Sequence, residues 1–313
     1  MFNRYLRTYP WWLQLMLFAL MVLTLLSFTA VILTAIIPAL SGYSLNAVLN
    51  PSVQSPKSLI NWATFTQAIG NFGGFGLPAL LFAYLAHPRA AAYLGMRKPG
   101  KNIQWVLIIL LAISSIPLSI GLMSLSQQLH WHWADVAEKN RNDMLEPILK
   151  NMSSPAGLLS VIAVFAVVPA LSEELFFRGV IMRFAKKRSK GMVFPILVSA
   201  IMFALAHASG YEFVSIFLMG VMLGLIYYWT RSILCSMLFH FLNNGVQIVL
   251  TYAAQGNAQL DKAINGNTVP TFAIICAALV FGISLYLLWK NRTPLPRDWA
   301  ADFTQEELSE KAL

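Results

Sequence analysis

The chain has 313 residues, of which 58% are hydrophobic and 11% are charged. Soluble globular proteins carry about 25% charged residues, so this composition excludes an ordinary soluble domain and indicates a protein dissolved mainly in lipid. The formal net charge of +9 would suggest nucleic acid in a soluble protein. In a membrane protein it is typical of basic loops on the cytoplasmic face, and we expect no nucleic-acid partner.

Apolar runs separated by polar breaks predict an all-α, polytopic bundle of about eight transmembrane helices. The second run is interrupted by glycines and Pro78, which membrane helices tolerate when their neighbours satisfy the backbone. With the N-terminus in the cytoplasm, most of the 22 Lys and Arg residues fall in inside segments. This distribution follows the positive-inside rule and places both termini in the cytoplasm. The predicted spans are 13–40, 70–86, 103–126, 156–182, 192–208, 213–230, 232–253 and 270–289.

The remaining segments flank a single integral membrane domain, 1–313, whose four-helix core is expected at 156–253. Segment 127–155 combines Trp131 and Trp133 with charged residues, which predicts an amphipathic helix at the outer interface; a solvated loop is the alternative. Segment 291–313 is acidic and predicts a cytoplasmic tail, either helical or disordered. The compact chain is typical of a bacterial protein, so we expect it in the bacterial inner membrane. The acidic residues of the tail include Asp302, Glu306, Glu307 and Glu310.

Three charged residues fall within the predicted fourth span: Glu173, Glu174 and Arg178. A charge near the bilayer centre costs at least about 2.5–3.5 kcal/mol, so charged residues occur there mainly where they form ion pairs or have a functional role. Glu174 and Arg178 have the i, i+4 spacing of an ion pair, which favours a structural role. Glu173 points about 100° away from Glu174. A carboxylate that is left partly unpaired in a low-dielectric site is a candidate general base.

Two histidines and an asparagine lie in later spans. His240 is followed at i+4 by Asn244, so the two share a helix face, and His207 follows Phe203 by one turn. A lone intramembrane histidine is often only a helix–helix hydrogen bond. At 1.5 Å per residue, however, Glu173, His207, His240 and Asn244 all lie about 12–22 Å from the cytoplasmic ends of their spans. This common depth predicts one buried polar site.

These residues resemble the three motifs of the CPBP intramembrane protease family. This family is also called Abi and includes the Rce1-like type II CaaX prenyl endopeptidases. The motifs are Glu173-Glu174-xxx-Arg178, Phe203-xxx-His207 and His240-xxx-Asn244, within residues 172–245. The resemblance implies that Glu173 and His207 position and deprotonate a water, that His240 and Asn244 stabilise the oxyanion, and that Glu174 and Arg178 brace the site.

The expected function is therefore hydrolysis of a peptide bond in a membrane-associated protein or peptide. Glu173, His207 and His240 could instead hold zinc as a metalloprotease, but the chain has no HExxH sequence, so we favour a site without a cofactor. Two other functions remain open: a non-catalytic immunity or scaffold protein of the same fold, and a proton-coupled transporter. The basic residues between Arg183 and Lys190 are expected to contact anionic membrane lipid.

Overall fold

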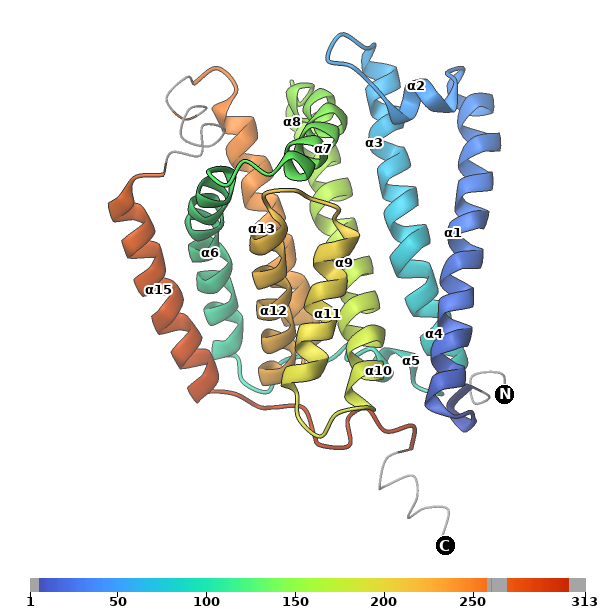
Figure 1. The fold of residues 1–313 in the computed structure, drawn as a ribbon, viewed down its shortest axis with the longest axis vertical. Helices are drawn as coiled ribbons and strands as arrows, with labels where there is room; N and C mark the ends of the chain where they lie inside the picture. Colours follow the sequence, from blue (N-terminus) through green and yellow to red (C-terminus); the bar gives the residue numbers. More distant parts are fainter. Residues whose placement is uncertain (1–5, 258–259, 261–268, 304–313) are drawn as a thin grey trace, which may run out of the picture.

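The structure is a computed structural model that describes residues 6–257, 260 and 269–303. All regular elements in these ranges are helical, which confirms the predicted all-α bundle, and the long helices stand side by side (Figure 1). In chain order the elements are η2 (Leu6–Thr8), α1 (Trp11–Ser41), α2 (Leu45–Leu49), α3 (Lys57–Asn71), η3 (Phe72–Gly76), α4 (Leu77–Ala86), α5 (Ala90–Tyr93), α6 (Ile103–Gln127), α7 (His132–Lys150), α8 (Pro155–Ile162), η4 (Ala163–Val167), α9 (Val168–Glu174), η5 (Leu175–Ile181), α10 (Met182–Lys186), α11 (Val193–Ala206), α12 (Phe213–Thr230), α13 (Ile233–Ala254) and α15 (Thr271–Lys290).

Among the described residues, seven helical segments are long and apolar enough to cross a membrane. The predicted fifth span is the exception. Its helix α11 has 14 residues and therefore rises about 21 Å, less than the roughly 30 Å of a hydrocarbon core. Figure 1 shows the α11–α12 turn well below the nearby ends of α3 and α8. The described residues thus hold seven helices of spanning length and one shorter apolar helix, in line with the predicted bundle of about eight transmembrane helices. The seven segments are Trp11–Ser41, Lys57–Ala86, Ile103–Gln127, Pro155–Lys186, Phe213–Thr230, Ile233–Ala254 and Thr271–Lys290.

The second span is longer than predicted, because it begins at Lys57 and not near residue 70. Its glycine-rich stretch does not end the helix but forms the π-helix η3 between α3 and α4. A Cβ on Gly73 would lie 2.4 Å from Oγ1 of Thr29 in α1, and a Cβ on Gly76 would lie 3.0 Å from Cβ of Ser172 in α9. The glycines therefore let this span pack closely against two neighbours.

Helix α7 covers the turn between α11 and α12. Tyr211 donates a hydrogen bond to Asp135 of α7, with 2.6 Å between the oxygens, and Arg141 of α7 forms an ion pair with Glu212. Gly210 lies so close to α7 that a Cβ would be 2.3 Å from the Ala134 carbonyl oxygen. The predicted amphipathic segment is therefore a helix, and its charged residues include the contacts that hold it over the turn.

The acidic tail is packed against the bundle as far as the structure describes it. Leu295 and Ala300 are buried, and the Leu295 amide donates to the Tyr228 carbonyl oxygen over 3.0 Å. The buried Arg183 donates to the carbonyl oxygens of Trp299 and Tyr93. In Figure 1 this segment runs beneath the helices from α15 towards α1. The first part of the tail is thus held against the bundle at Leu295 and Ala300, and Glu306, Glu307 and Glu310 lie outside the described residues.

Candidate active site

The fourth span carries the two adjacent carboxylates of the site at the end of α9. Glu173 is 5% exposed and Glu174 is fully buried. Glu174 Oε1 accepts a hydrogen bond from Arg178 Nη1 at 2.7 Å and lies 3.0 Å from His240 Nδ1. The predicted pair of Glu174 and Arg178 is therefore present, and it also contacts a candidate catalytic histidine on α13.

Arg178 is fully buried and is held on three sides. Besides Glu174, its guanidinium donates to the Gly220 carbonyl oxygen of α12 at 3.0 Å and lies over the Phe203 ring of α11, 4.5 Å from the centroid. A Cβ on Gly220 would be 2.9 Å from Cα of Ala200, so the glycine permits the close approach of α11 and α12. Arg178 thereby joins the fourth span to both α11 and α12.

Glu173 has a different set of partners. Its Oε1 accepts a hydrogen bond from Nδ2 of Asn71 at 2.7 Å. Its Oε2 lies 3.8 Å from His207 Nε2 and 4.0 Å from His240 Nε2. Among the described residues neither Oε2 of Glu173 nor Nε2 of His240 has a hydrogen-bond partner. The structure therefore brings three of the four predicted catalytic residues together around one carboxylate oxygen.

The hydrogen bonds of the two histidines fix which ring nitrogen carries a proton. His207 Nδ1 lies 2.7 Å from the Phe203 carbonyl oxygen, which can only accept, so Nδ1 must donate. His240 Nδ1 faces Glu174, which Arg178 also contacts, and it donates in the same way. In each neutral ring Nε2 is then an acceptor. Both acceptors face Oε2 of Glu173, so a group with protons to donate fits between them.

Asn244 does not join this group in the structure. Its Nδ2 donates to the Phe165 carbonyl oxygen in η4 at 3.2 Å, and this hydrogen bond ties α13 to the fourth span. An amide nitrogen has two protons, so one remains available after this contact. The i+4 spacing from His240 predicted the shared helix face but did not reveal the competing backbone acceptor.

Asn71 is the site residue that the sequence analysis missed. It is the last residue of α3 and precedes the π-helix η3. Its Oδ1 accepts a hydrogen bond from the Ser172 hydroxyl, so its amide contacts both Ser172 and Glu173. A polar residue within an apolar span was the available signal, but residue 71 fell among the glycines that were read as an interruption.

Three π-helices surround the carboxylates. η4 and η5 flank α9 within the fourth span, and η3 follows Asn71 in the second span. π-helical turns are rare and occur frequently at functional sites, because the extra residue shifts the side chains that follow. Their placement on both sides of Glu173 supports this region as the functional centre.

The proposed zinc ligands do not form a metal site in this arrangement. Zinc binds imidazole nitrogen and carboxylate oxygen at about 2.0–2.2 Å, so tetrahedral ligand atoms lie about 3.4 Å apart. The two nitrogens are 3.8 and 4.0 Å from Oε2 of Glu173. No group of three or more His, Cys, Asp or Glu side chains in the described part of the chain could hold a metal ion.

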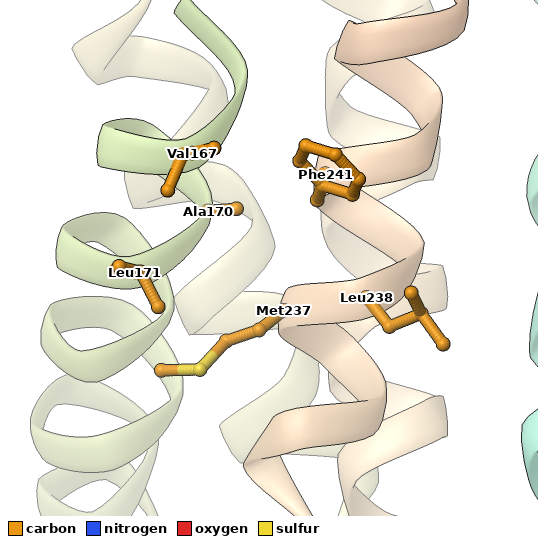
Figure 2. Close-up of a pocket in the computed structure, with 6 residues that line it drawn as sticks. All are labelled: Val167, Ala170, Leu171, Met237, Leu238 and Phe241. Carbon is orange, nitrogen blue, oxygen red and sulfur yellow. The ribbon is translucent and has the colours of Figure 1, made fainter. Parts of the chain in front are cut away.

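An apolar groove lies between η4–α9 and α13, the segments that also carry Glu173 and His240 (Figure 2). Figure 2 shows side chains of the fourth span facing side chains of α13 across the groove, which has a volume of about 290 Å³. Leu171 and Phe241 on its walls are near neighbours in sequence of Glu173 and His240. A hydrophobic segment in this groove would lie between the two helices that carry Glu173 and His240. The lining residues are Val167, Ala170, Leu171, Met237, Leu238 and Phe241.

The site is also bordered by the α11–α12 turn, which α7 covers. The His207 side chain is 30% exposed, whereas that of His240 is fully buried, so the site is most open where α11 ends. Glu212 of the same turn is largely enclosed, and this burial raises the pKa of its carboxyl while Arg141 opposes the shift. The hydrogen bond to Asp135 raises the pKa of the Tyr211 hydroxyl.

The bundle is all-helical and holds acidic and imidazole side chains within its apolar helices. These features define a multi-pass membrane protein with an intramembrane site. Residues 155–246 match the family model described as Rce1-like, type II CAAX prenyl endopeptidase. Residues 155–246 are thus similar to this family of proteases, which confirms the resemblance drawn from the three motifs. No curated protein and no solved structure matches the chain.

Proposed function

We propose that the protein is an intramembrane endopeptidase that hydrolyses a peptide bond of a membrane-associated protein or peptide with a glutamate-activated water. The observation that carries this proposal is the convergence of His207 Nε2 and His240 Nε2 on Oε2 of Glu173, in a buried site. A water between these acceptors has two protons, so it donates one to Oε2 of Glu173 and the other to His207 Nε2, and its lone pairs are then directed at the substrate. The family match supports the same reaction class.

In the proposed reaction Glu173 is the general base. Its Oε2 takes a proton from the water as the water oxygen bonds to the carbonyl carbon of the substrate. His207 accepts the second hydrogen bond of the water and orients it. The proton on Glu173 then passes to the amide nitrogen as the C–N bond breaks, which releases a carboxylic acid and an amine and restores the carboxylate.

The tetrahedral intermediate carries a negative oxygen that needs hydrogen-bond donors. The free proton of Asn244 can supply one such bond, and removal of one oxyanion donor costs about 2.7–4 kcal/mol in other hydrolases. His240 can supply another only when both of its ring nitrogens are protonated, because Nδ1 already donates to Glu174. Glu174 and Arg178 support this role by holding the His240 ring in place.

The proposed substrate is a protein or peptide with an apolar segment at the membrane. The groove of Figure 2 is lined by apolar side chains of the two segments that also carry Glu173 and His240, so it can hold such a segment between them. We propose the bacterial inner membrane as the location, with both termini in the cytoplasm. A metal cofactor is not part of the proposal.

The test compares new protein termini by mass spectrometry in membranes of cells that express wild type or Glu173→Ala at equal levels. Termini present only with wild type would establish proteolysis and identify substrates. Glu146→Ala is the matched control, because Glu146 is an exposed glutamate paired with Lys150 on α7. Identical termini in wild type and Glu173→Ala, with both proteins folded, would overturn the proposal and favour the scaffold or transporter function.

A further inference from the structure

Asn71 lies outside the residues that match the family, yet it makes the shortest described contact of the proposed general base. Its Nδ2 donates to Oε1 of Glu173 at 2.7 Å, and Ser172 donates to its Oδ1. We infer that Asn71 is a positioning residue: its amide holds one oxygen of Glu173 so that the other faces the two histidines. The inference rests on the proposed function, because it assigns Asn71 a part in the same reaction.

The orientation of the Asn71 amide follows from its two partners. A carboxylate oxygen only accepts hydrogen bonds, so the side of the amide that faces Glu173 must be the nitrogen. On the other side lies the Ser172 hydroxyl, which has one proton, can also accept, and is 2.6 Å from the Val168 carbonyl oxygen. A flipped amide would place Oδ1 against the carboxylate, where two acceptors would face each other. The carboxylate of Glu173 therefore selects the orientation, and the hydroxyl of Ser172 is compatible with it.

This contact determines which oxygen of Glu173 is free to react. A glutamate side chain has three rotatable bonds and two equivalent oxygens, so an unheld carboxylate samples many orientations. With Oε1 bound to Asn71, Oε2 remains without a partner and lies 3.8 and 4.0 Å from the two imidazole nitrogens. Asn71 is neutral, so it fixes the carboxylate without supplying the full positive charge that Arg178 gives to Glu174.

The second span is built to bring Asn71 to this place. Gly76 lies one turn after Asn71, and a Cβ there would be 3.0 Å from Cβ of Ser172. Real Cβ contacts are seldom so close, so a side chain at this position would push the second span away from α9. The π-helix η3 begins directly after Asn71. The glycines of the second span thus allow this span to pack against the fourth span next to Glu173.

The inference is tested with Asn71→Ala, Asn71→Asp and the matched control Thr66→Val. Thr66 is also buried on α3, but its hydroxyl bonds only its own helix, to the Trp62 carbonyl oxygen at 2.7 Å. Cleavage rates are measured in proteoliposomes with a membrane protein that wild type cleaves and Glu173→Ala does not. Misplacement of a catalytic group by about 1 Å can slow a reaction about a hundredfold. We therefore expect Asn71→Ala to lower kcat about a hundredfold with KM unchanged, and Thr66→Val to match wild type.

The Asn71→Asp variant supplies a readout that a purely structural role would not change. An aspartic acid can donate to Oε1 of Glu173 only while it holds a proton, and two adjacent carboxylates share one proton. The Asn71→Asp variant should therefore be partly active at low pH, where its aspartic acid is protonated. As the pH rises, it should lose activity at a lower pH than wild type does. A rate of Asn71→Ala equal to that of Thr66→Val, or a pH profile of Asn71→Asp like that of wild type, would overturn the inference while leaving the proposed function intact.

An infrared measurement separates a failure of the proposed function from a failure of the role of Asn71, because it needs no substrate. The difference spectrum between a protein and its Glu173→Gln counterpart isolates the carboxyl band of Glu173, whose frequency depends on its hydrogen bonds. We expect this band to shift in Asn71→Ala and to stay in place in Thr66→Val. If Glu173→Ala cleaves as well as wild type, the proposed function fails, and the band alone decides whether Asn71 holds the carboxylate. An unshifted band in Asn71→Ala would overturn the inference.

Discussion

The pair formed by Glu174 and Arg178 gives the sharpest prediction about stability. Both side chains are fully buried, and 2.7 Å separates Oε1 from Nη1, so neither charge has water to replace a lost partner. Removing one partner of a buried ion pair costs about 3–5 kcal/mol. We expect Arg178→Met and Glu174→Gln each to lower the free energy of unfolding by about this amount. Arg178→Met also loses the hydrogen bond to Gly220 and the contact with Phe203, so its loss should be the larger.

The double variant Glu174→Gln/Arg178→Met removes both charges and leaves no unpaired ion. Its loss should be at least about 2 kcal/mol smaller than the sum of the two single losses, within the range of coupling measured for contacting residues. The free energy of unfolding is measured by denaturant titration in mixed micelles, with tryptophan fluorescence as the signal. The nine tryptophans of the chain provide that signal.

The matched control is a second i, i+4 pair, Glu146 and Lys150 on α7, whose side chains are 47% and 60% exposed. Exposed pairs contribute about 0.2–1 kcal/mol, so the same cycle at this pair should give a coupling below about 1 kcal/mol. Equal coupling at the buried and exposed pairs, or additive losses at Glu174 and Arg178, would refute the argument from burial.

Three further predictions follow from other contacts. Gly220→Leu should destabilise the protein by about 1–3 kcal/mol through overpacking, because its Cβ would meet the backbone of Ala200 at 2.9 Å; unfolding in micelles measures this, and wild-type stability would contradict it. A zinc chelator should leave the cleavage rate unchanged, because the donors around Glu173 do not form a metal site in the described residues; loss of activity that zinc restores would contradict this. Burial raises the pKa of Glu212 above its ordinary value, although Arg141 opposes the shift, so the folded protein binds this proton more tightly than the unfolded chain does. Glu212 should therefore stabilise the fold increasingly as the pH falls through that raised pKa towards the ordinary value. Unfolding in micelles as a function of pH measures this, and Glu212→Gln should remove the dependence.

The sequence predicted the chemistry of the site better than the extent of its helices. Charged and imidazole residues are so costly in lipid that Glu173, His207 and His240 were identifiable as a group, and their estimated depths agreed with one another. The ends of the helices were harder to predict from the sequence. The apolar run of the predicted fifth span continues to Ala208, so hydropathy could not reveal that the chain turns at His207, where α7 contacts the following residues.

The second span shows why local sequence was insufficient. Residues 57–69 include Lys57, Asn61 and Gln67, which lower the apolar character of the run and shifted its predicted start to residue 70. The helix extends through them because its polar side chains meet partners on other elements; Gln67, for example, donates to Met144 of α7 at 3.3 Å. Such tertiary contacts between distant segments cannot be read from periodicity, and the role of Asn71 was missed for the same reason.

The contrast between the two adjacent glutamates explains why one of them is suited to act as a base. Glu174 has a guanidinium and an imidazole as partners of one oxygen, and any movement of its carboxylate would break a buried ion pair. Glu173 has only the neutral amide of Asn71 on one oxygen and no partner on the other. Taking up a proton on that free oxygen breaks none of its described hydrogen bonds, whereas protonating Glu174 would weaken its attraction to Arg178. Neighbouring positions on one helix thus separate a structural carboxylate from a reactive one, and the separation depends on Asn71 of the second span, His240 of α13 and Arg178 of the fourth span itself.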